Sequence, residues 1–340
     1  MGQVAAPIRE LPACRPGALP LGALLDAGEP VVLRGVAAHW PLVAAGRGGV
    51  QAAMDYLKAH ATERPVQYSH GDREVAGRPF YRAGFTALNC EVRRARLDQV
   101  LDEIAGHLDD AAPPTFYVAS QRVDACMPGL RTDNDLDFAA HGVEAPPSIW
   151  IGNRVTASCH YDAPNNIACC AVGRRRFTLF PPDQIGNLYP GPLDPTPGGQ
   201  AVSVVDFAQP DFERFPRFRE ALATARSAEL EPGDALFIPS MWWHHVEALA
   251  PFNVLVNYWW TGAPAWMPSP MHALHLALWA IRDRPEREKQ AWREVFDYYV
   301  FGPCERAGAH LPEAARGLLG PLDDTRARQL RASLIDRLNR

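Results

Sequence analysis

The sequence predicts a mainly β protein, built as a sandwich or a barrel, with helical segments before and after the β region. From Thr115 to about Trp260, short apolar or alternating runs are separated by Pro, Gly, Asp and Asn turns, which is the pattern of such folds. Long runs with helical spacing occur only outside this region. The runs that we expect to be strands are TFYVA, SIWIGN, RFTLF, ALFIP and FNVLVNYWW.

Length and composition indicate a globular protein with a sizeable core. The chain has 340 residues, of which 47% are hydrophobic and 21% charged, and these values exclude a disordered chain. This length accommodates one β domain and an appendage. A formal net charge of −5 gives no support for nucleic-acid binding through a basic surface.

We expect a cytoplasmic protein without a membrane anchor. The chain start lacks the basic and continuous apolar segments of a secretory signal, and no window offers about eighteen uninterrupted apolar residues. The cysteines are odd in number and lack a CxxC pair, which argues against a disulfide framework or a zinc ribbon. We expect most of them to be small buried hydrophobes. They are Cys14, Cys90, Cys126, Cys159, Cys169, Cys170 and Cys304.

Apolar spacing locates the helices outside the β region. The segment LGALLDAGEPVVLRG predicts a short helix and then a strand at Pro30–Leu33. Helices are expected at about residues 51–60 and 94–108, packed outside a sheet. The tail after Pro270 returns to helix, with a possible cap at Asp324 or Thr325 for the last one. Its apolar positions are Trp292, Val295, Phe296, Tyr299 and Val300 on one face, and Leu330, Leu334 and Leu338 on another.

The stretch SCHYDAP contains two metal-capable side chains at a two-residue spacing. In an extended strand His160 and Asp162 point to the same face, while Tyr161 points away. The third candidate is His244, which begins a strand after the turn at residues 231–234 and the buried run ALFIP. Two His and one Asp form the facial triad of non-haem Fe(II) oxygenases, which leaves positions open for a cosubstrate and O₂. The adjacent His245 should face the opposite way and pack rather than bind metal.

These motifs resemble a known family. The segments HYDAPNN, GRRRFTLFPPDQIGNLYP and PGDALFIPSMWWHHVEAL, with PVVLRGVAAHWP near the start, resemble the JmjC-type, cupin-like 2-oxoglutarate oxygenases, most closely the hypoxia-inducible-factor asparaginyl hydroxylase. The resemblance implies a double-stranded β-helix, or jelly roll, that holds Fe(II) through His160, Asp162 and His244. It also implies 2-oxoglutarate and O₂ as cosubstrates, succinate and CO₂ as products, and hydroxylation of a protein or peptide side chain.

The resemblance further implies residues that contact 2-oxoglutarate. Arg175 stands where relatives carry a Lys for the distal carboxylate, and a guanidinium can clamp a carboxylate through two hydrogen bonds. The alternative is that Arg174, Arg175 and Arg176 form a solvated strand end. Tyr117 matches a Tyr that binds the same carboxylate, although a Tyr in a strand is also ordinary core.

Three more positions are candidates for the same pocket. Relatives often carry a Thr where Ala157 stands; by two-residue parity Thr156 and Ser158 share the face of His160, and Thr156 is the preferred substitute. Asn166 and Asn257 match pocket asparagines, although Asn166 could also belong to a turn. A buried amide such as that of Asn257 must find hydrogen-bond partners.

The resemblance leaves several questions open. Relatives use the loop at about residues 188–215 to cover the substrate, but its middle, DPTPGGQAVSV, differs from that of the asparaginyl hydroxylase. A small metabolite or a tRNA nucleoside is therefore an alternative substrate, and a non-catalytic metal-binding module is an alternative function. Residues 1–268 are expected to form the catalytic domain. Residues 269–340 form a helical segment that either makes a homodimer, as in the family, or packs on its own barrel.

Overall fold

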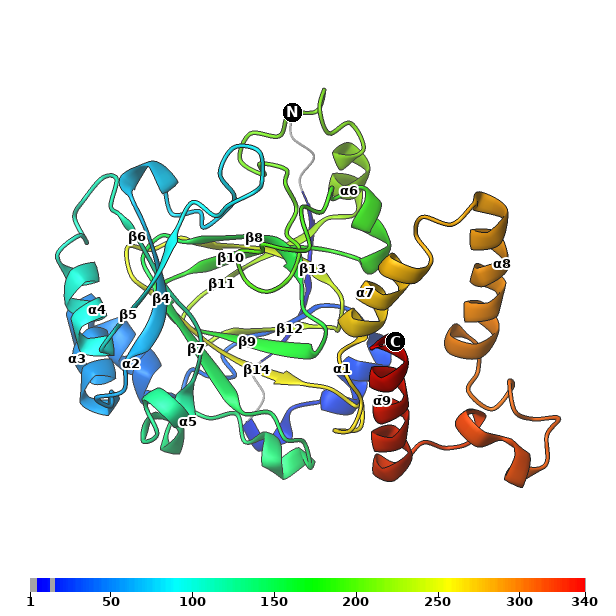
Figure 1. The fold of residues 1–340 in the computed structure, drawn as a ribbon. Helices are drawn as coiled ribbons and strands as arrows, with labels where there is room; N and C mark the ends of the chain where they lie inside the picture. Colours follow the sequence, from blue (N-terminus) through cyan, green and yellow to red (C-terminus); the bar gives the residue numbers. More distant parts are fainter. Residues whose placement is uncertain (1–4, 13–15, 340) are drawn as a thin grey trace. The chain divides into compact units, whose positions relative to one another are not determined.

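The computed structural model describes residues 5–12 and 16–339 (Figure 1). Contacts divide the chain into two compact units, Met1–Thr261 and Gly262–Arg340, and each unit is described by itself. Cys14 lies outside the described residues. Among the residues described, no helix is both long enough and apolar enough to cross a membrane.

Two β-sheets form the first unit. The smaller sheet has the order β1 (Ala6–Pro7), β11 (Arg226–Leu230), β10 (Arg175–Phe180), β13 (Trp243–Ala248) and β8 (Thr156–Tyr161). The larger sheet has the order β2 (Arg9–Leu11), β3 (Val31–Leu33), β12 (Ala235–Ile238), β9 (Asn165–Val172), β14 (Asn253–Trp260), β7 (Pro147–Gly152), β6 (Thr115–Arg122), β4 (Val66–Gly71) and β5 (Glu91–Ala95). The predicted fold class, a mainly β protein with a jelly-roll core, is confirmed.

Side chains alternate between the inside and the outside of this barrel. Cys170, Phe177, Leu236 and Leu255 belong to one buried cluster between the sheets. Their neighbours in sequence on the larger sheet point outward into a second cluster, which the helices cover. A third cluster, which includes Trp243, covers the outer face of the smaller sheet. The two-residue period therefore builds three packed layers, and only the inner one can host a site within the barrel.

Helices cover the outside of the first unit. The buried residues Leu97, Leu101 and Ile104 confirm that the predicted helix packs with one apolar face, but the helix is shorter than residues 94–108 because Arg94 and Ala95 belong to strand β5. Four of the five β5 side chains are exposed, so the strand has no apolar alternation that would identify it. The helices are α1 (Leu21–Ala27), α2 (Pro41–Gly48), α3 (Val50–His60), α4 (Leu97–Ala105), α5 (Val123–Cys126) and α6 (Phe218–Thr224). Shorter 3-10 turns are η1 (Pro16–Ala18), η2 (Arg73–Val75), η3 (Leu130–Thr132), η4 (Phe138–His141) and η5 (Pro182–Gly186).

The second unit is helical, as predicted for the tail. It contains α7 (Pro270–Ala280), α8 (Glu286–Phe296), a π-helical turn η6 (Asp297–Phe301), η7 (Glu313–Ala315), η8 (Gly317–Leu319) and α9 (Asp324–Leu338). The cap predicted at Asp324 or Thr325 is wrong by one residue, because the Asp323 side chain accepts a hydrogen bond from the Arg326 amide. Trp292, Val295 and Tyr299 keep large exposed fractions.

Candidate metal centre

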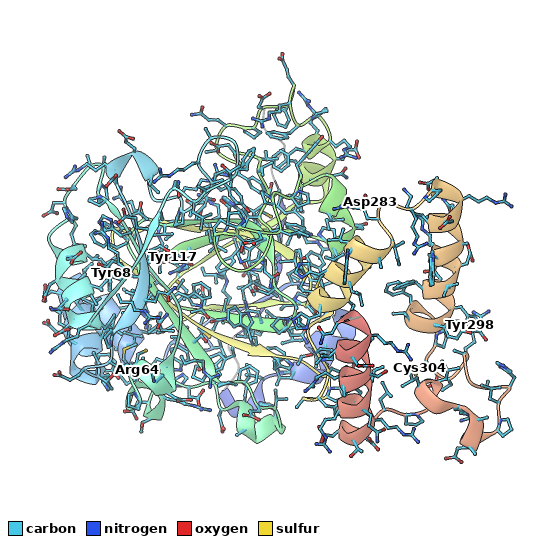
Figure 2. All side chains as sticks on the ribbon, in the orientation of Figure 1. Arg64, Tyr68, Tyr117, Asp283, Tyr298 and Cys304 are labelled. Carbon is cyan, nitrogen blue, oxygen red and sulfur yellow. The ribbon has the colours of Figure 1, made fainter. Side chains whose placement is uncertain are left out.

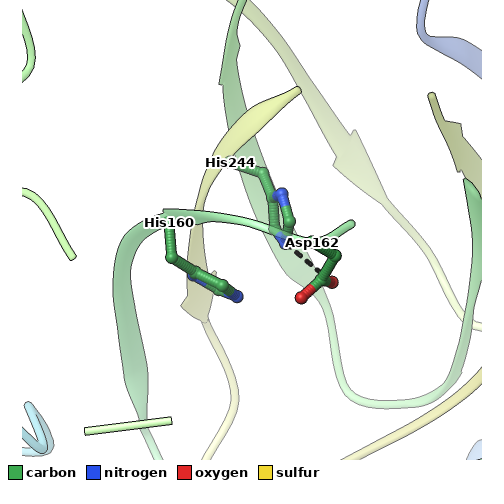
Figure 3. A group of neighbouring side chains, drawn as sticks. All are labelled: His160, Asp162 and His244. Carbon is green, nitrogen blue, oxygen red and sulfur yellow. Dashed lines mark ion pairs between the residues drawn. The ribbon is translucent and has the colours of Figure 1, made fainter. Parts of the chain in front are cut away.

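Strands β8 and β13 bring the three predicted ligands together. The two strands pair antiparallel with His160 opposite His244, and Asp162 follows directly after the end of β8. Ligand atoms of His160, Asp162 and His244 all lie within 4.8 Å of one another (Figure 3). The His244 Nε2 atom lies 3.6 Å from Asp162 Oδ2. Residues more than eighty positions apart in sequence therefore converge on one point, as the two-His, one-carboxylate prediction requires.

Backbone carbonyl groups orient both imidazole rings. The Nδ1 atom of His160 lies 2.8 Å from the Ser158 carbonyl oxygen, and the Nδ1 atom of His244 lies 3.0 Å from the Trp242 carbonyl oxygen. A carbonyl can only accept, so Nδ1 carries the proton on each ring and donates. Nε2 is then left with its lone pair, which is the atom that a metal ion binds.

Burial keeps His244 in its neutral form. Loss of solvation, together with the nearby His160, lowers the pKa of His244 to about 4. At neutral pH its ring is therefore uncharged, as metal ligation requires. Two imidazole nitrogens and one carboxylate are a donor set suited to Fe(II), and three protein ligands would leave further coordination positions for other molecules.

The turn between β12 and β13 fixes the loop that carries the carboxylate. The Met241 amide donates to the Asp162 carbonyl at 2.9 Å, and the Ser240 hydroxyl donates to the Ala163 carbonyl at 2.6 Å. The Ser240 amide also donates to Asn165 Oδ1 at 3.0 Å. These bonds hold the backbone of Asp162 against the turn that precedes β13, the strand of the third ligand.

Trp259 orients the carboxylate itself. Its indole Nε1 donates to Asp162 Oδ2 at 3.2 Å. From the sequence, this residue had only a place in the predicted strand run FNVLVNYWW. The inward parity of β14, which it shares with Leu255 and Asn257, was the available signal.

A cavity beside the triad has two parts that share lining residues. Its outer part, of about 370 Å³, has His160 and Asp162 in its wall together with Trp150 and Trp259. A smaller inner part, of about 50 Å³, shares those four residues and also reaches His244 and Arg175. Pro197, Gly198, Gln200 and Val202 from the loop at residues 188–215 line the outer part, so this loop borders the entrance.

Arg175 points into the barrel and has an unused donor. Its side chain is buried, with the residue 4% exposed, and its Nε has no hydrogen-bond partner. Burial lowers its pKa, while the nearby Cys170 and Tyr117 oppose this shift. Arg174 and Arg176 instead point outward and form ion pairs with Glu229. A buried guanidinium with a free donor is costly unless an anion pairs with it, which fits a carboxylate ligand in the inner cavity.

Tyr117 lies beside both parts of the cavity, and Figure 2 labels it among the side chains of the first unit. Burial raises its pKa to about 12, with Arg175 opposing and Asp162 adding to the shift. Its hydroxyl is therefore protonated at neutral pH and can donate a hydrogen bond. The ring packs against Trp150 at a centroid separation of 5.8 Å.

The predicted parity of Thr156 is wrong. His244 pairs with His160, and Val246 pairs with Ala157. The two residues on β13 are two positions apart in sequence, whereas their partners on β8 are three positions apart. The extra residue is a β-bulge, which reverses the faces of β8 on its N-terminal side. Ala157 consequently lines the inner cavity, while Thr156 stands opposite Glu247 and lines only the outer cavity and the groove outside the barrel.

Asn166 and Asn257 are buried and bonded to each other. Asn257 Nδ2 donates to Asn166 Oδ1 at 3.2 Å, and Asn257 Oδ1 accepts from Trp150 Nε1 at 2.7 Å. Both asparagines line the inner cavity. The side-chain oxygen and nitrogen of Asn257 both bond to these neighbours, so Asn257 positions Asn166 and Trp150. The amide nitrogen of Asn166 has no hydrogen bond to Asn257 or Trp150.

His245 faces away from the triad, as predicted for the residue next to a ligand. It stands opposite Thr178 on β10 and stacks on Phe207 at a centroid separation of 4.4 Å. Its Nδ1 is buried without a partner, and burial lowers its pKa to about 3. It belongs to the packing outside the barrel.

The jelly-roll barrel and its two-His, one-carboxylate site define a cupin-type fold with a candidate metal centre. The model of the cupin-like domain family matches residues 21–265, and the chain belongs to that family. Its relatives include HSPB1-associated protein 1 of Homo sapiens, which is 37% identical over 36% of this chain and 25% of that protein. Lysine-specific demethylase 8 of Xenopus tropicalis is 28% identical over 68% and 48%, and Jumonji C domain-containing protein 5 of Drosophila melanogaster is 26% identical over 69% and 55%.

These matches confirm the predicted JmjC-type, cupin-like family. The greater similarity to the asparaginyl hydroxylase than to other members of the family stays a prediction. The chain spans only 25% to 55% of the length of the three relatives named above.

Proposed function

We propose that this protein is an Fe(II)- and 2-oxoglutarate-dependent dioxygenase that hydroxylates a protein or peptide side chain. The observation that carries the proposal is the convergence of His160, Asp162 and His244 within 4.8 Å in the wall of the cavity. Membership of the cupin-like family supports the same chemistry. Fe(II), 2-oxoglutarate and O₂ together would supply an oxidation that yields succinate, CO₂ and a hydroxylated product.

The triad residues would hold the iron through His160 Nε2, His244 Nε2 and the Asp162 carboxylate. The Ser158 and Trp242 carbonyl groups keep each Nε2 free of a proton, and the Trp259 indole limits rotation of the carboxylate. These fixed orientations reduce the reorganisation that metal binding would otherwise require.

Arg175 would pair with the distal carboxylate of 2-oxoglutarate, and Tyr117 would donate to the same group. The guanidinium lies in the wall of the inner cavity with an unpartnered Nε, and the Tyr117 hydroxyl, which is protonated at neutral pH, lines the same wall. Asn166 contributes its amide to the same wall. Apolar neighbours such as Phe177 and Leu255 exclude water from this region, which strengthens each charge-assisted hydrogen bond.

Succinate formation tests this function. The purified full chain is loaded anaerobically with Fe(II) and 2-oxoglutarate, then exposed to O₂ with a random-sequence peptide pool. We expect succinate from the native chain and none from Asp162→Ala. Absence of succinate from a native chain that is folded and has bound iron would overturn the proposed chemistry. If succinate formation rises with small metabolites or nucleosides but not with peptides, the substrate belongs to one of those classes instead.

We further propose that residues 1–268 are the catalytic domain and residues 269–340 a dimerisation segment. The exposed side chains of Trp292, Val295 and Tyr299 support this, because an apolar helix face is stabilised when another surface covers it. Light scattering of the full chain is expected to give the mass of a dimer, and Trp292→Glu with Tyr299→Glu to give that of a monomer. A native monomer at micromolar concentration would contradict the proposal.

We also propose a cytoplasmic location for the protein. The described cysteines Cys90, Cys126, Cys159, Cys169, Cys170 and Cys304 are free thiols, a state that a reducing compartment maintains. Fractionation of the cells that make the protein, followed by immunodetection, is expected to recover it with cytoplasmic markers.

A further inference from the structure

We propose that the outer cavity admits a neutral, mainly apolar side chain and discriminates against ammonium, guanidinium and carboxylate groups. The inference rests on the proposed function, since the cavity matters to substrate choice only if the triad carries out the reaction. It concerns the class of side chain that reaches the triad and leaves the sequence around that side chain open.

The wall of the outer cavity lacks a counterion for any charged group. Among the described residues that line it, the acidic and basic side chains are those of His160 and Asp162, and both are triad members. No Lys, Arg or Glu of the described chain is in that wall. A charged group that leaves water for this space would therefore lose its hydration without gaining a partner, which is strongly unfavourable.

Asp162 cannot serve as that counterion. Its Oδ2 accepts from Trp259 Nε1 at 3.2 Å and lies 3.6 Å from His244 Nε2. In the proposed function the same carboxylate also binds iron. Its charge is thus already shared among the groups of the metal centre, and a substrate ammonium would compete with the metal for it.

The remaining wall suits a neutral group. Pro79, Trp150, Val202 and Trp259 present apolar surface, so an apolar side chain gains free energy by leaving water there. Ser120 and Gln200 offer neutral hydrogen-bonding groups near that surface. These residues can satisfy an amide, a hydroxyl or a peptide group without supplying a net charge.

The aromatic residues do not form a cage for a methylated ammonium group. Such a cage places several ring faces around one open space. Here Tyr117 and Trp150 pack on each other at 5.8 Å with an interplanar angle of 33°, and Trp150 meets Trp259 edge to face at 5.8 Å and 85°. The rings therefore pack partly on one another and do not surround one open space with several ring faces.

A paired peptide experiment isolates the effect of charge. One random-sequence pool contains free lysine, and a second is the same pool after acetylation of its lysines, which removes the charge and keeps the chain. Each pool is incubated with the iron-loaded full chain, 2-oxoglutarate and O₂. Mass spectrometry then counts added oxygen atoms and lost methyl groups at each residue type, with Asp162→Ala as the blank. Synthetic trimethyllysine peptides form a third arm.

We expect oxidation at neutral residues to exceed that at Lys, Arg, trimethyllysine, Asp and Glu by roughly tenfold or more, because an unpaired buried charge costs at least 1.4 kcal/mol. Comparable oxidation at any charged residue would overturn the inference while leaving the proposed function intact. No succinate at all would instead sink the proposed function. Succinate without peptide oxidation would remove the peptide as substrate and this inference with it.

Gln200→Glu provides a gain-of-function variant. It adds one carboxylate to the wall without changing the length of the side chain, so the ratio of lysine to acetyllysine oxidation should rise several-fold. Gln200→Met, which adds no charge but also removes the amide, is the matched control and should raise the ratio less than Gln200→Glu does. An unchanged ratio in Gln200→Glu would show that charge at this wall does not set the preference, which contradicts the inference.

Discussion

The Trp259 indole donates to Oδ2 of Asp162 across 3.2 Å, and the two residues are 97 positions apart in the chain. Asp162 is the only one of the three candidate ligands that stands in a loop, directly after β8. A bond from the rigid strand β14 (Asn253–Trp260) therefore compensates for the freedom that a loop would allow the carboxylate.

Removal of this bond is expected to weaken metal binding. Trp259→Phe keeps an aromatic ring and loses the donor, and a loss of this kind typically costs roughly 10- to 100-fold in metal affinity. Isothermal titration with Mn(II), as a redox-stable substitute for Fe(II), measures the effect. Trp260→Phe is the control, because Trp260 packs outward against Phe138 and Phe237. Equal affinities in native and Trp259→Phe chains would refute the orienting role.

Loss of a ligand is expected to abolish both metal binding and turnover. His160→Ala or Asp162→Ala leaves two of three donors, which cannot hold a metal facially. Mn(II) titration and succinate formation provide separate measurements. His245→Phe should retain both properties, because that ring stacks on Phe207 outside the barrel. If His245→Phe also lost the metal, the assignment of the adjacent His244 as the ligand would be wrong.

Arg175→Met is expected to weaken 2-oxoglutarate binding without lowering the thermal stability of the protein. The loss of a charge-assisted pair should cost about 1.5–3 kcal/mol of 2-oxoglutarate binding, which appears as a raised Kd. The melting temperature should stay unchanged or rise, because the variant replaces a buried charge that lacks a partner at Nε. Calorimetry and thermal denaturation test the two halves. A lowered melting temperature with native 2-oxoglutarate affinity would assign Arg175 a structural role instead.

The bulge in β8 predicts opposite outcomes for neighbouring residues. Ala157→Leu places a larger side chain in the wall of the inner cavity and should raise the Kd for 2-oxoglutarate by at least tenfold. Thr156→Val removes a hydroxyl from a residue outside that cavity and should leave the Kd within about twofold. A larger effect of Thr156→Val than of Ala157→Leu would show that Thr156, and not Ala157, faces the inner cavity.

Local patterns predicted several strands and the triad, but not strands β4, β9 and β11. Strand runs such as ALFIP, the HxD spacing and the turn before His244 are all short-range signals, and each stands where it was expected. Arg175 points inward because strand alternation extends through β10 without interruption. Strand β5 was missed because an edge strand with mostly exposed residues has no apolar pattern.

Features that depend on pairing between distant strands were beyond sequence reasoning. The extra residue that turns Thr156 outward is visible only in the register of β8 against β13. The same limit applies to the bond between Trp259 and Asp162 and to the mutual bonding of Asn166 and Asn257. Local spacing predicts that Trp259 and Asn257 point inward, but the partners that they meet there are set by the folded barrel.

The irregular register of β8 makes the pocket insensitive to a change in the length of this strand. Loss of a single residue at Ser158 or Cys159 would restore an even ladder upstream of His160 and would keep Ala157 opposite Val246, because the lost residue is the one that β13 does not match. The metal-binding end of the strand, anchored against His244, would also keep its place. One deletion at this point should thus leave the ligand and the inward methyl group where they are.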